Sequence, residues 1–216
     1  MRLPDKWSKA PLTGAAVIVL LAVGLLITLT GQAAWASYTF GFWPGAPDLG
    51  PRVPIWLQPL SATLAHSHPL HVLFNVLVLT FCGRPVETVL GSPAIAILYV
   101  LGAYAAAGAE YLVSPGVPLV GASFAISAVI GAYAILFGKN KVKLANPTLA
   151  LLVNALWLMI VWVTLQIFIG IAQDGAAFLS GPRGGGVPVA AAAHIGGFVV
   201  GILLANPLLL FKYRKA

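Results

Sequence analysis

Charged residues are scarce in this chain of 216 residues, which has 12 lysines and arginines and only 5 acidic residues. Charged side chains make up 8% of the sequence, hydrophobic side chains make up 60%, and the mean hydropathy is +0.96. A water-soluble domain typically has about a quarter charged residues. The composition therefore excludes an ordinary soluble domain and predicts an integral membrane protein.

Cysteine is almost absent, and the single Cys82 excludes an internal disulfide. A cleavable signal peptide is not expected either, because the first apolar run lacks a clear small-residue cleavage site and is typical of a membrane anchor. The net charge of +7 could indicate a nucleic-acid partner. However, the basic residues lie in short segments between apolar runs, as they do in membrane proteins, so we expect no nucleic acid.

Six apolar runs are candidates for transmembrane helices, since a helix needs about 20 residues to cross the hydrocarbon core. They cover residues 12–30, 64–82, 94–112, 117–137, 147–172 and 188–211. The sequence therefore predicts a single all-α domain over residues 1–216, a polytopic bundle of six transmembrane helices. A long loop at 31–63 joins the first two runs, and its composition of Pro, Gly and Trp indicates ordered structure at the lipid–water interface.

Basic residues lie mostly on one side of the membrane in this arrangement. Arg52 and Arg183 are the exceptions among the twelve lysines and arginines. Because positive residues are concentrated on the cytoplasmic side, we expect both termini in the cytoplasm and the loop at 31–63 on the outer face.

Polar side chains lie near the outer starts of the second, fourth and sixth runs, where an ionisable or nucleophilic group is costly and suggests function. Ser123 lies five residues after Pro118, and His194 lies six residues after Pro188. At about 1.5 Å rise per residue, both should lie at a similar depth. The second run contributes His66, His68, His71 and Asn75. We therefore expect three helices to bring polar groups into one outer layer.

Small residues recur every four positions in the fourth and sixth runs, a pattern that favours close approach of membrane helices. The residues are Ser123, Ser127 and Gly131 in one run, and Ala193, Gly197 and Gly201 in the other. Ordinary helix packing could produce the same pattern. Its coincidence with Ser123 and His194 favours a serine–histidine hydrogen bond.

A serine hydroxyl becomes a nucleophile when a base such as neutral histidine takes its proton. The resulting oxyanion needs hydrogen-bond donors. His71 and Asn75 are four residues apart, on one face of a helix, and can supply them. Glu110 and Asp174 lie at outer ends of runs, where plain interfacial carboxylates are expected. The sequence therefore predicts a dyad without an acidic third member.

These motifs resemble the rhomboid family of intramembrane serine proteases. The resemblance rests on three motifs in order on alternate runs: His66-x4-His71-x3-Asn75, Gly121-Ala122-Ser123 and Ala193-His194-x-Gly196-Gly197. It implies cleavage of peptide bonds in or beside transmembrane segments of single-span or polytopic membrane proteins. It also implies a bacterial inner-membrane location, an active site open to the outer face, and no metal or organic cofactor.

By position, the resemblance implies that Ser123 is the nucleophile and His194 the general base and acid. Asn75, His71 and the backbone N–H of Ser123 would form the oxyanion hole. The other residues that it implies as support for the site are His66, Gly121 and Gly197.

Two positions depart from the family pattern. Phe124 stands where rhomboids usually have a glycine directly after the nucleophile, and its ring could shape substrate specificity or mark an inactive relative. The Trp-Arg pair of the first outer loop is not intact, because Leu57 and Gln58 follow Trp56. The second departure concerns the support of that loop more than the chemistry.

Three other functions compete with proteolysis. The histidines of the second run could suggest a metal site, but no acidic or cysteine ligand joins them and the His-Glu-x-x-His motif of metalloproteases is absent. A transporter would be expected to show internal repeats, and none is evident. An inactive rhomboid-like protein that binds membrane helices is the main alternative.

Overall fold

The computed structural model describes residues 7–138, 146–174 and 190–214. Within these ranges the chain is helical, apart from loops and a single antiparallel bridge between Phe42 and Leu119. The all-α prediction is confirmed for these ranges.

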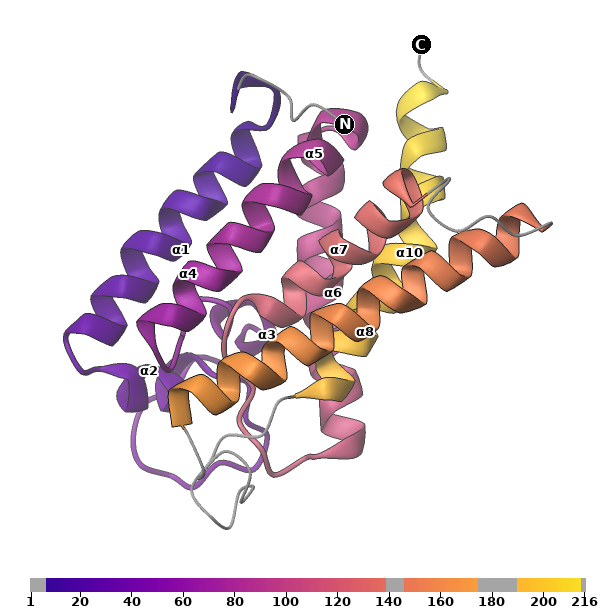
Figure 1. The fold of residues 1–216 in the computed structure, drawn as a ribbon. Coiled ribbons are helices and arrows are strands. Elements are labelled where there is room, and N and C mark those ends of the chain that lie inside the picture. Colours follow the sequence, from indigo (N-terminus) through magenta and orange to yellow (C-terminus); the bar gives the residue numbers. More distant parts are fainter. Residues whose placement is uncertain (1–6, 139–145, 175–189, 215–216) are drawn as a thin grey trace.

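Helices of very different length follow one another along the chain (Figure 1). Their bounds are η1 (Trp7–Lys9), α1 (Pro11–Leu29), α2 (Ala33–Phe40), α3 (Gln58–Ser61), α4 (Pro69–Val78), η2 (Leu79–Gly83), α5 (Arg84–Leu90), α6 (Ser92–Val113), α7 (Ser123–Phe137), α8 (Pro147–Asp174) and α10 (Ala191–Tyr213).

Five helical segments of the described residues are long and apolar enough to cross a membrane: Pro11–Leu29, Pro69–Leu90, Ser92–Val113, Pro147–Ala172 and Ala191–Tyr213. The chain is thus a multi-pass membrane protein. The fourth predicted run contains a helix of only 15 residues, Ser123–Phe137, which is shorter than the roughly 20 residues of a typical span. The structure therefore supports five full-length spans and a short apolar helix, and the count of six is not established by length.

The second span is displaced toward the C-terminus relative to the sequence prediction of 64–82. Its helix begins at Pro69, and the His68 side chain caps it by accepting a hydrogen bond from the Leu70 N–H at 3.2 Å. Proline is favoured at the first position of a helix, where its missing N–H is not needed. The π-helical turn η2 then joins α4 to α5, so the span continues to Leu90.

The fourth run differs more, because residues 117–122 are not helical. Leu119 pairs with Phe42 in the bridge. Gly121 has φ +101°, which is incompatible with a right-handed helical backbone. The helix α7 begins at Ser123. The depth estimate that counted helical rise from Pro118 was therefore wrong for Ser123, and Pro188, its counterpart for His194, lies outside the described residues.

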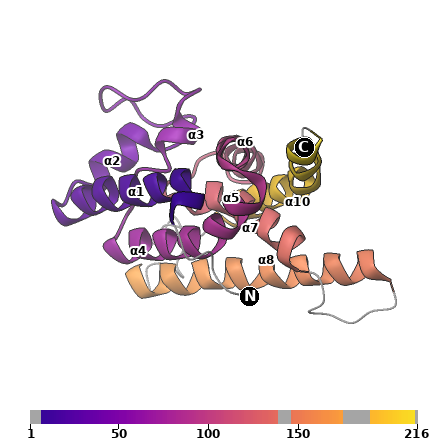
Figure 2. The ribbon, with the colours of Figure 1, turned by 90° about the horizontal axis from the view of Figure 1, so that it is seen from above.

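Helix α7 occupies the middle of the bundle, with α6 and α10 on one side and α4 and α5 on the other (Figures 1 and 2). Of its 15 residues, 12 are buried, which explains why so short a helix is apolar all round. Glycines allow α10 to approach it closely. A Cβ on Gly201 would collide with the Ala128 carbonyl, and one on Gly131 with the Phe198 carbonyl. The predicted close packing of the fourth and sixth runs is confirmed.

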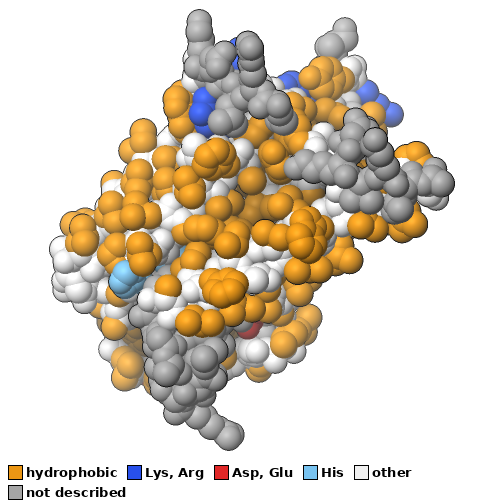
Figure 3. Space-filling view, viewed as in Figure 1, with side chains coloured by type: hydrophobic (Ala, Val, Ile, Leu, Met, Phe, Trp, Pro, Cys, Tyr) orange, Lys and Arg blue, Asp and Glu red, His pale blue; other side chains and the backbone are white. Residues whose placement is uncertain are grey.

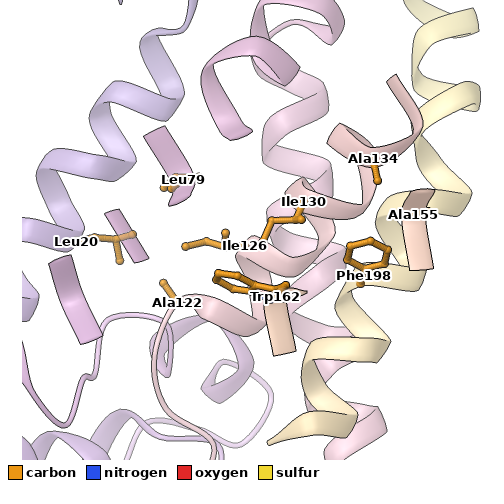
Figure 4. Packing of buried hydrophobic residues seen from close by; sticks show 9 residues of the cluster. All are labelled: Leu20, Leu79, Ala122, Ile126, Ile130, Ala134, Ala155, Trp162 and Phe198. Atoms are coloured by element: carbon orange, nitrogen blue, oxygen red, sulfur yellow. The ribbon is translucent and has the colours of Figure 1, made fainter. Parts of the chain in front are cut away.

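Helix α8 runs obliquely along the outside of the bundle (Figures 1 and 2). Two of its buried residues, Ala155 and Trp162, join a hydrophobic cluster with residues of α7 and α10 (Figure 4). The rest of the bundle presents a largely hydrophobic face (Figure 3).

Lysine and arginine side chains gather at the end of the bundle where α1 begins and α10 ends (Figure 3). There the Lys212 ammonium donates to the Val89 carbonyl at 2.7 Å, and the Arg84 guanidinium lies 4.2 Å from the centre of the Trp7 ring. Glu87 ties the same end together. Its carboxylate accepts from the backbone N–H groups of Leu12 and Thr13, at 3.0 and 2.7 Å.

Candidate active site

Ser123 and His194, 71 residues apart in sequence, meet at hydrogen-bonding distance. The Ser123 Oγ lies 3.0 Å from the His194 Nε2, and both residues are buried. Ser123 is the first residue of α7, and His194 is the fourth residue of α10. The structure thus brings together the two residues that the sequence singled out.

The histidine ring is oriented by its second nitrogen. The His194 Nδ1 lies 2.7 Å from the Ala190 carbonyl. Because a carbonyl only accepts hydrogen bonds, Nδ1 must carry the proton in the neutral ring. The Nε2 lone pair then faces the Ser123 hydroxyl, which is the tautomer that a general base requires.

Gly197 allows this approach of α10 to the start of α7. A Cβ at Gly197 would collide with the Phe124 carbonyl and would lie 3.1 Å from the Ser127 Cβ. The glycine is therefore required by the separation of the two helices that carry Ser123 and His194.

His71 lies against the loop that precedes Ser123. Gly121 adopts φ +101°, and a Cβ there would lie 2.6 Å from the His71 Cε1 and 2.9 Å from its Nε2. Any side chain at 121 would displace the imidazole. The His71 Nε2 is buried and has no hydrogen-bond partner among the described residues.

Asn75 is held by His66. The Asn75 Nδ2 lies 3.1 Å from the His66 Nε2, which also accepts from the Ala122 N–H at 3.4 Å. The His66 Nδ1 lies 3.2 Å from the Leu64 carbonyl and so must donate to it. This assignment uses one of the two Asn75 amide hydrogens and leaves the other available.

His66 precedes the second span, and its burial lowers its pKa to about 4. The ring is therefore neutral at neutral pH, as its role as an acceptor from Asn75 and Ala122 demands. His66 thereby connects α4 to Ala122, the residue directly before Ser123.

Phe124 points into the core. Its side chain is fully buried and packs in a cluster with alanines of α6, which are Ala103, Ala106 and Ala107. The small side chains of α6 provide the room that the ring occupies. Small residues on the neighbouring helix α6 thus make room for Phe124, at the position where the resemblance to rhomboids leads us to expect a glycine.

Glu110 is not the interfacial carboxylate that the sequence predicted. It is 5% exposed, and its Oε2 accepts a hydrogen bond from the Ala193 N–H at 3.1 Å. The N–H groups in the first turn of a helix have no partner within their own helix. The Ala193 N–H, in the first turn of α10, is one of these groups, and Glu110 accepts its hydrogen bond. The ring nitrogens of His194 face Ala190 and Ser123 instead, so Glu110 contacts the backbone and not the imidazole. The side chain of Asp174 lies outside the described residues.

Two residues whose role the sequence did not indicate, Arg52 and Gln58, organise the loop between α2 and α3. The Arg52 guanidinium donates to the carbonyls of Tyr38, Trp43 and Gly41, at 2.9, 3.2 and 3.4 Å. The Gln58 amide donates to the Val53 carbonyl at 2.9 Å and accepts from the Trp43 N–H at 3.2 Å. Together they support the loop in which the family's Trp-Arg pair is not intact.

The described residues contain no group of three His, Cys, Asp or Glu side chains arranged to hold a metal ion. His68, the second of the three histidines of the predicted second run, caps α4 through its Nδ1. The ring centres of His66 and His71 lie 5.1 Å apart in an edge-to-face arrangement, which is a packing contact.

Comparison with known proteins supports the resemblance to the rhomboid family. A family model described as the Rhomboid domain matches residues 55–211. The chain is 27% identical over 202 residues to the rhomboid protease GlpG of Pectobacterium atrosepticum, covering 93% of this chain and 63% of the relative. The corresponding protein of Serratia proteamaculans is 28% identical over 202 residues, which cover 92% of this chain and 63% of the relative.

The match to the rhomboid protease GlpG of Yersinia pestis is 25% identical over 197 residues, covering 90% of this chain and 62% of the relative. The chain thus spans somewhat less than two thirds of the length of these curated relatives. The family model, however, covers all three motifs of the site, from His66 to Gly197. The chain belongs to the rhomboid family.

Proposed function

We propose that this chain is an intramembrane serine endopeptidase that cleaves transmembrane segments of other membrane proteins. The observation that carries the proposal is the 3.0 Å contact between the Ser123 hydroxyl and the Nε2 of a His194 ring whose tautomer suits a general base. The curated relatives are named rhomboid proteases, and the family match supports the same class of reaction.

In the first half of the reaction, the Ser123 Oγ attacks the scissile carbonyl carbon and its proton passes to the His194 Nε2. Collapse of the tetrahedral intermediate breaks the C–N bond, and His194 returns the proton to the leaving amine. A water molecule, deprotonated by the same nitrogen, then hydrolyses the acyl-enzyme and regenerates Ser123.

The negative charge of the intermediate needs donors held in advance. We assign this role to the free Asn75 amide hydrogen, the His71 Nε2 and the backbone N–H of Ser123. Two of these features support the assignment directly: His66 fixes the Asn75 amide, and the buried His71 Nε2 has no partner among the described residues. The Ser123 N–H opens α7, where backbone donors lack intrahelical partners.

We further propose that both termini face the cytoplasm of a bacterial cell and that the site opens to the outer face of the inner membrane. The cluster of Lys and Arg at the end of the bundle where α1 begins and α10 ends supports this orientation (Figure 3). Single-span or polytopic membrane proteins would be the substrates.

The test is covalent labelling of the detergent-solubilised protein by a fluorophosphonate, together with cleavage of a model transmembrane substrate. Wild type should react, and Ser123→Ala and His194→Ala should lose about 10³-fold or more of the rate. The matched control is Ser37→Ala, whose hydroxyl donates to the Ala33 carbonyl within α2. Equal labelling of wild type and both dyad variants would refute the proposal. So would a wild type that neither labels nor cleaves, which would favour an inactive helix-binding relative.

A further inference from the structure

Trp162, a residue of helix α8, lies beside the dyad. The tryptophan is 3% exposed, and its indole Nε1–H donates to the Ser127 Oγ at 2.8 Å. The Ser127 hydroxyl lies 2.8 Å from the backbone carbonyl of Ser123. An indole nitrogen only donates and a carbonyl only accepts, so the single hydroxyl hydrogen of Ser127 must point to Ser123. The direction of the whole chain of hydrogen bonds is therefore fixed.

The same indole ring contacts the general base. The ring centres of Trp162 and His194 lie 6.1 Å apart with an angle of 66° between the planes, an edge-to-face arrangement. The two nitrogens of His194 are already directed at Ala190 and Ser123. The indole closes a further side of the imidazole and so restrains its tilt.

A third contact joins Trp162 to the helix of the oxyanion donor. Its ring stacks on Phe74, with centres 5.7 Å apart and planes 12° from parallel, and Phe74 directly precedes Asn75. Trp162 thus touches elements that carry the nucleophile, the base and a donor. Figure 4 shows its ring against the start of α7, beside Ile126.

The surroundings of α8 make this contact distinctive. Most of the helix lies on the outside of the bundle, and Trp157, the other tryptophan of α8, is 65% exposed. Hydrophobic burial alone would not require a hydrogen bond from the indole to a serine that itself binds the nucleophile's carbonyl. A buried Ser127 with both its donor and acceptor used is costly to disturb.

We propose that Trp162 is a positioning residue of the dyad, acting with Ser127 as one unit to hold Ser123 and His194 in register. This inference rests on the proposed hydrolase function. In this proposal α8, which contributes no catalytic residue, directly affects the rate of the chemical step. Loss of the indole N–H should let the start of α7 and the imidazole shift, and displacement of a catalytic pair by about 1 Å can cost on the order of 100-fold in rate.

The experiment measures the second-order rate constant of fluorophosphonate inactivation, which reports the reactivity of Ser123 without requiring a transmembrane substrate to enter. The variants are Trp162→Phe, Ser127→Ala and the double variant, and Trp157→Phe is the control on the same helix. We expect each single variant to lose about 10- to 100-fold, the double variant to lose no more than the worse single, and Trp157→Phe to match wild type. For a cleaved substrate, kcat should fall with KM little changed.

A folded Trp162→Phe that reacts like wild type would overturn the inference, as would losses that multiply in the double variant, because independent effects add in free energy. A structural role alone would lower the thermal midpoint without changing the rate of the folded fraction, so both are measured. If Trp162→Phe does not fold, Ser127→Ala decides alone: unchanged reactivity refutes the inference, and a kcat loss supports it. An unreactive wild type would refute the proposed function, and this inference with it.

Discussion

The carboxylate of Glu110, on α6, accepts a hydrogen bond from the backbone N–H of Ala193 at 3.1 Å, and Ala193 directly precedes His194. The N–H groups in the first turn of α10 have no partner in their own helix. A buried carboxylate at this position satisfies one of them and complements the positive end of the helix dipole. The start of α10, and with it the backbone of His194, is thereby anchored to a neighbouring helix.

Replacing Glu110 should therefore affect catalysis through the backbone. We expect Glu110→Ala to lower kcat about 10-fold or more, because small displacements of a catalytic group are costly, and to lower the thermal midpoint. Glu110→Gln keeps an acceptor oxygen and should retain most of the activity. The measurement is kcat for a model substrate, with Asp48→Ala in the exposed outer loop as control. A fully active Glu110→Ala would show that the start of α10 needs no such anchor.

The oxyanion assignment predicts a graded series at Asn75, in the second span, and at His66, which precedes it. Asn75→Ala should lower kcat by about 10²–10³-fold, the usual effect of removing one oxyanion donor. His66→Ala should cost less, because it leaves the amide in place and removes only its restraint. The double variant should resemble Asn75→Ala alone, since His66 acts through the amide. A His66→Ala effect that fully adds to the Asn75→Ala effect would contradict this order.

Phe124 is placed where its loss should destabilise the protein. The ring is fully buried among alanines of α6, so Phe124→Ala should lower the free energy of unfolding by about 3–5 kcal/mol, as large-to-small core substitutions do. Phe124→Gly should cost roughly 1 kcal/mol more because glycine disfavours a helix. Leu112→Ala, at a side chain that is 83% exposed, is the control. A gain of activity with unchanged stability in Phe124→Gly would instead indicate that the ring obstructs the site.

The pairing of Ser123 with His194 could be predicted because it follows from local patterns. Small residues at a spacing of four define which helix faces meet, and Ser123 and His194, near the starts of those faces, then become partners. The boundaries of the helices were harder to predict from the sequence. The start of α7 at Ser123 depends on the bridge from Leu119 to Phe42, a contact made across 77 residues of sequence, and an apolar run gives no sign of it.

Glu110 and Arg52 show the same limit for polar residues. Each lies in sequence where an exposed charge is expected, and each is satisfied by backbone groups of distant or neighbouring segments that only the folded chain brings near. Trp162 is a comparable case, since a tryptophan in an apolar run is typical of lipid-facing or interfacial positions. Hydrogen-bond partners of this kind are set by tertiary structure and carry no sequence pattern.

The contacts of Arg52 predict the stability of the loop between α2 and α3. Its guanidinium binds three carbonyls in a planar fork that a lysine cannot reproduce. Both Arg52→Ala and Arg52→Lys should therefore increase hydrogen exchange in residues 41–58, with alanine the more severe. Exchange in α7 should be unchanged. Protection of the loop equal to that of wild type in Arg52→Ala would show that Gln58 suffices to hold it.

The last prediction concerns the contact between α7 and α10 on which the dyad depends. A Cβ at Gly197 would collide with the carbonyl of Phe124, next to the nucleophile, whereas a Cβ at Gly108 on α6 meets nothing within 4 Å. Gly197→Ala should push the two helices apart, lengthen the 3.0 Å contact between Ser123 and His194, and reduce fluorophosphonate reactivity on the order of 100-fold. Gly108→Ala should leave reactivity unchanged and raise stability by up to about 1 kcal/mol, since alanine favours a helix. Because both changes add one methyl group to a helical glycine, a difference between them measures the close approach alone. Equal, wild-type reactivity in the two variants would contradict the prediction, because the dyad would then not depend on this close approach of α7 and α10.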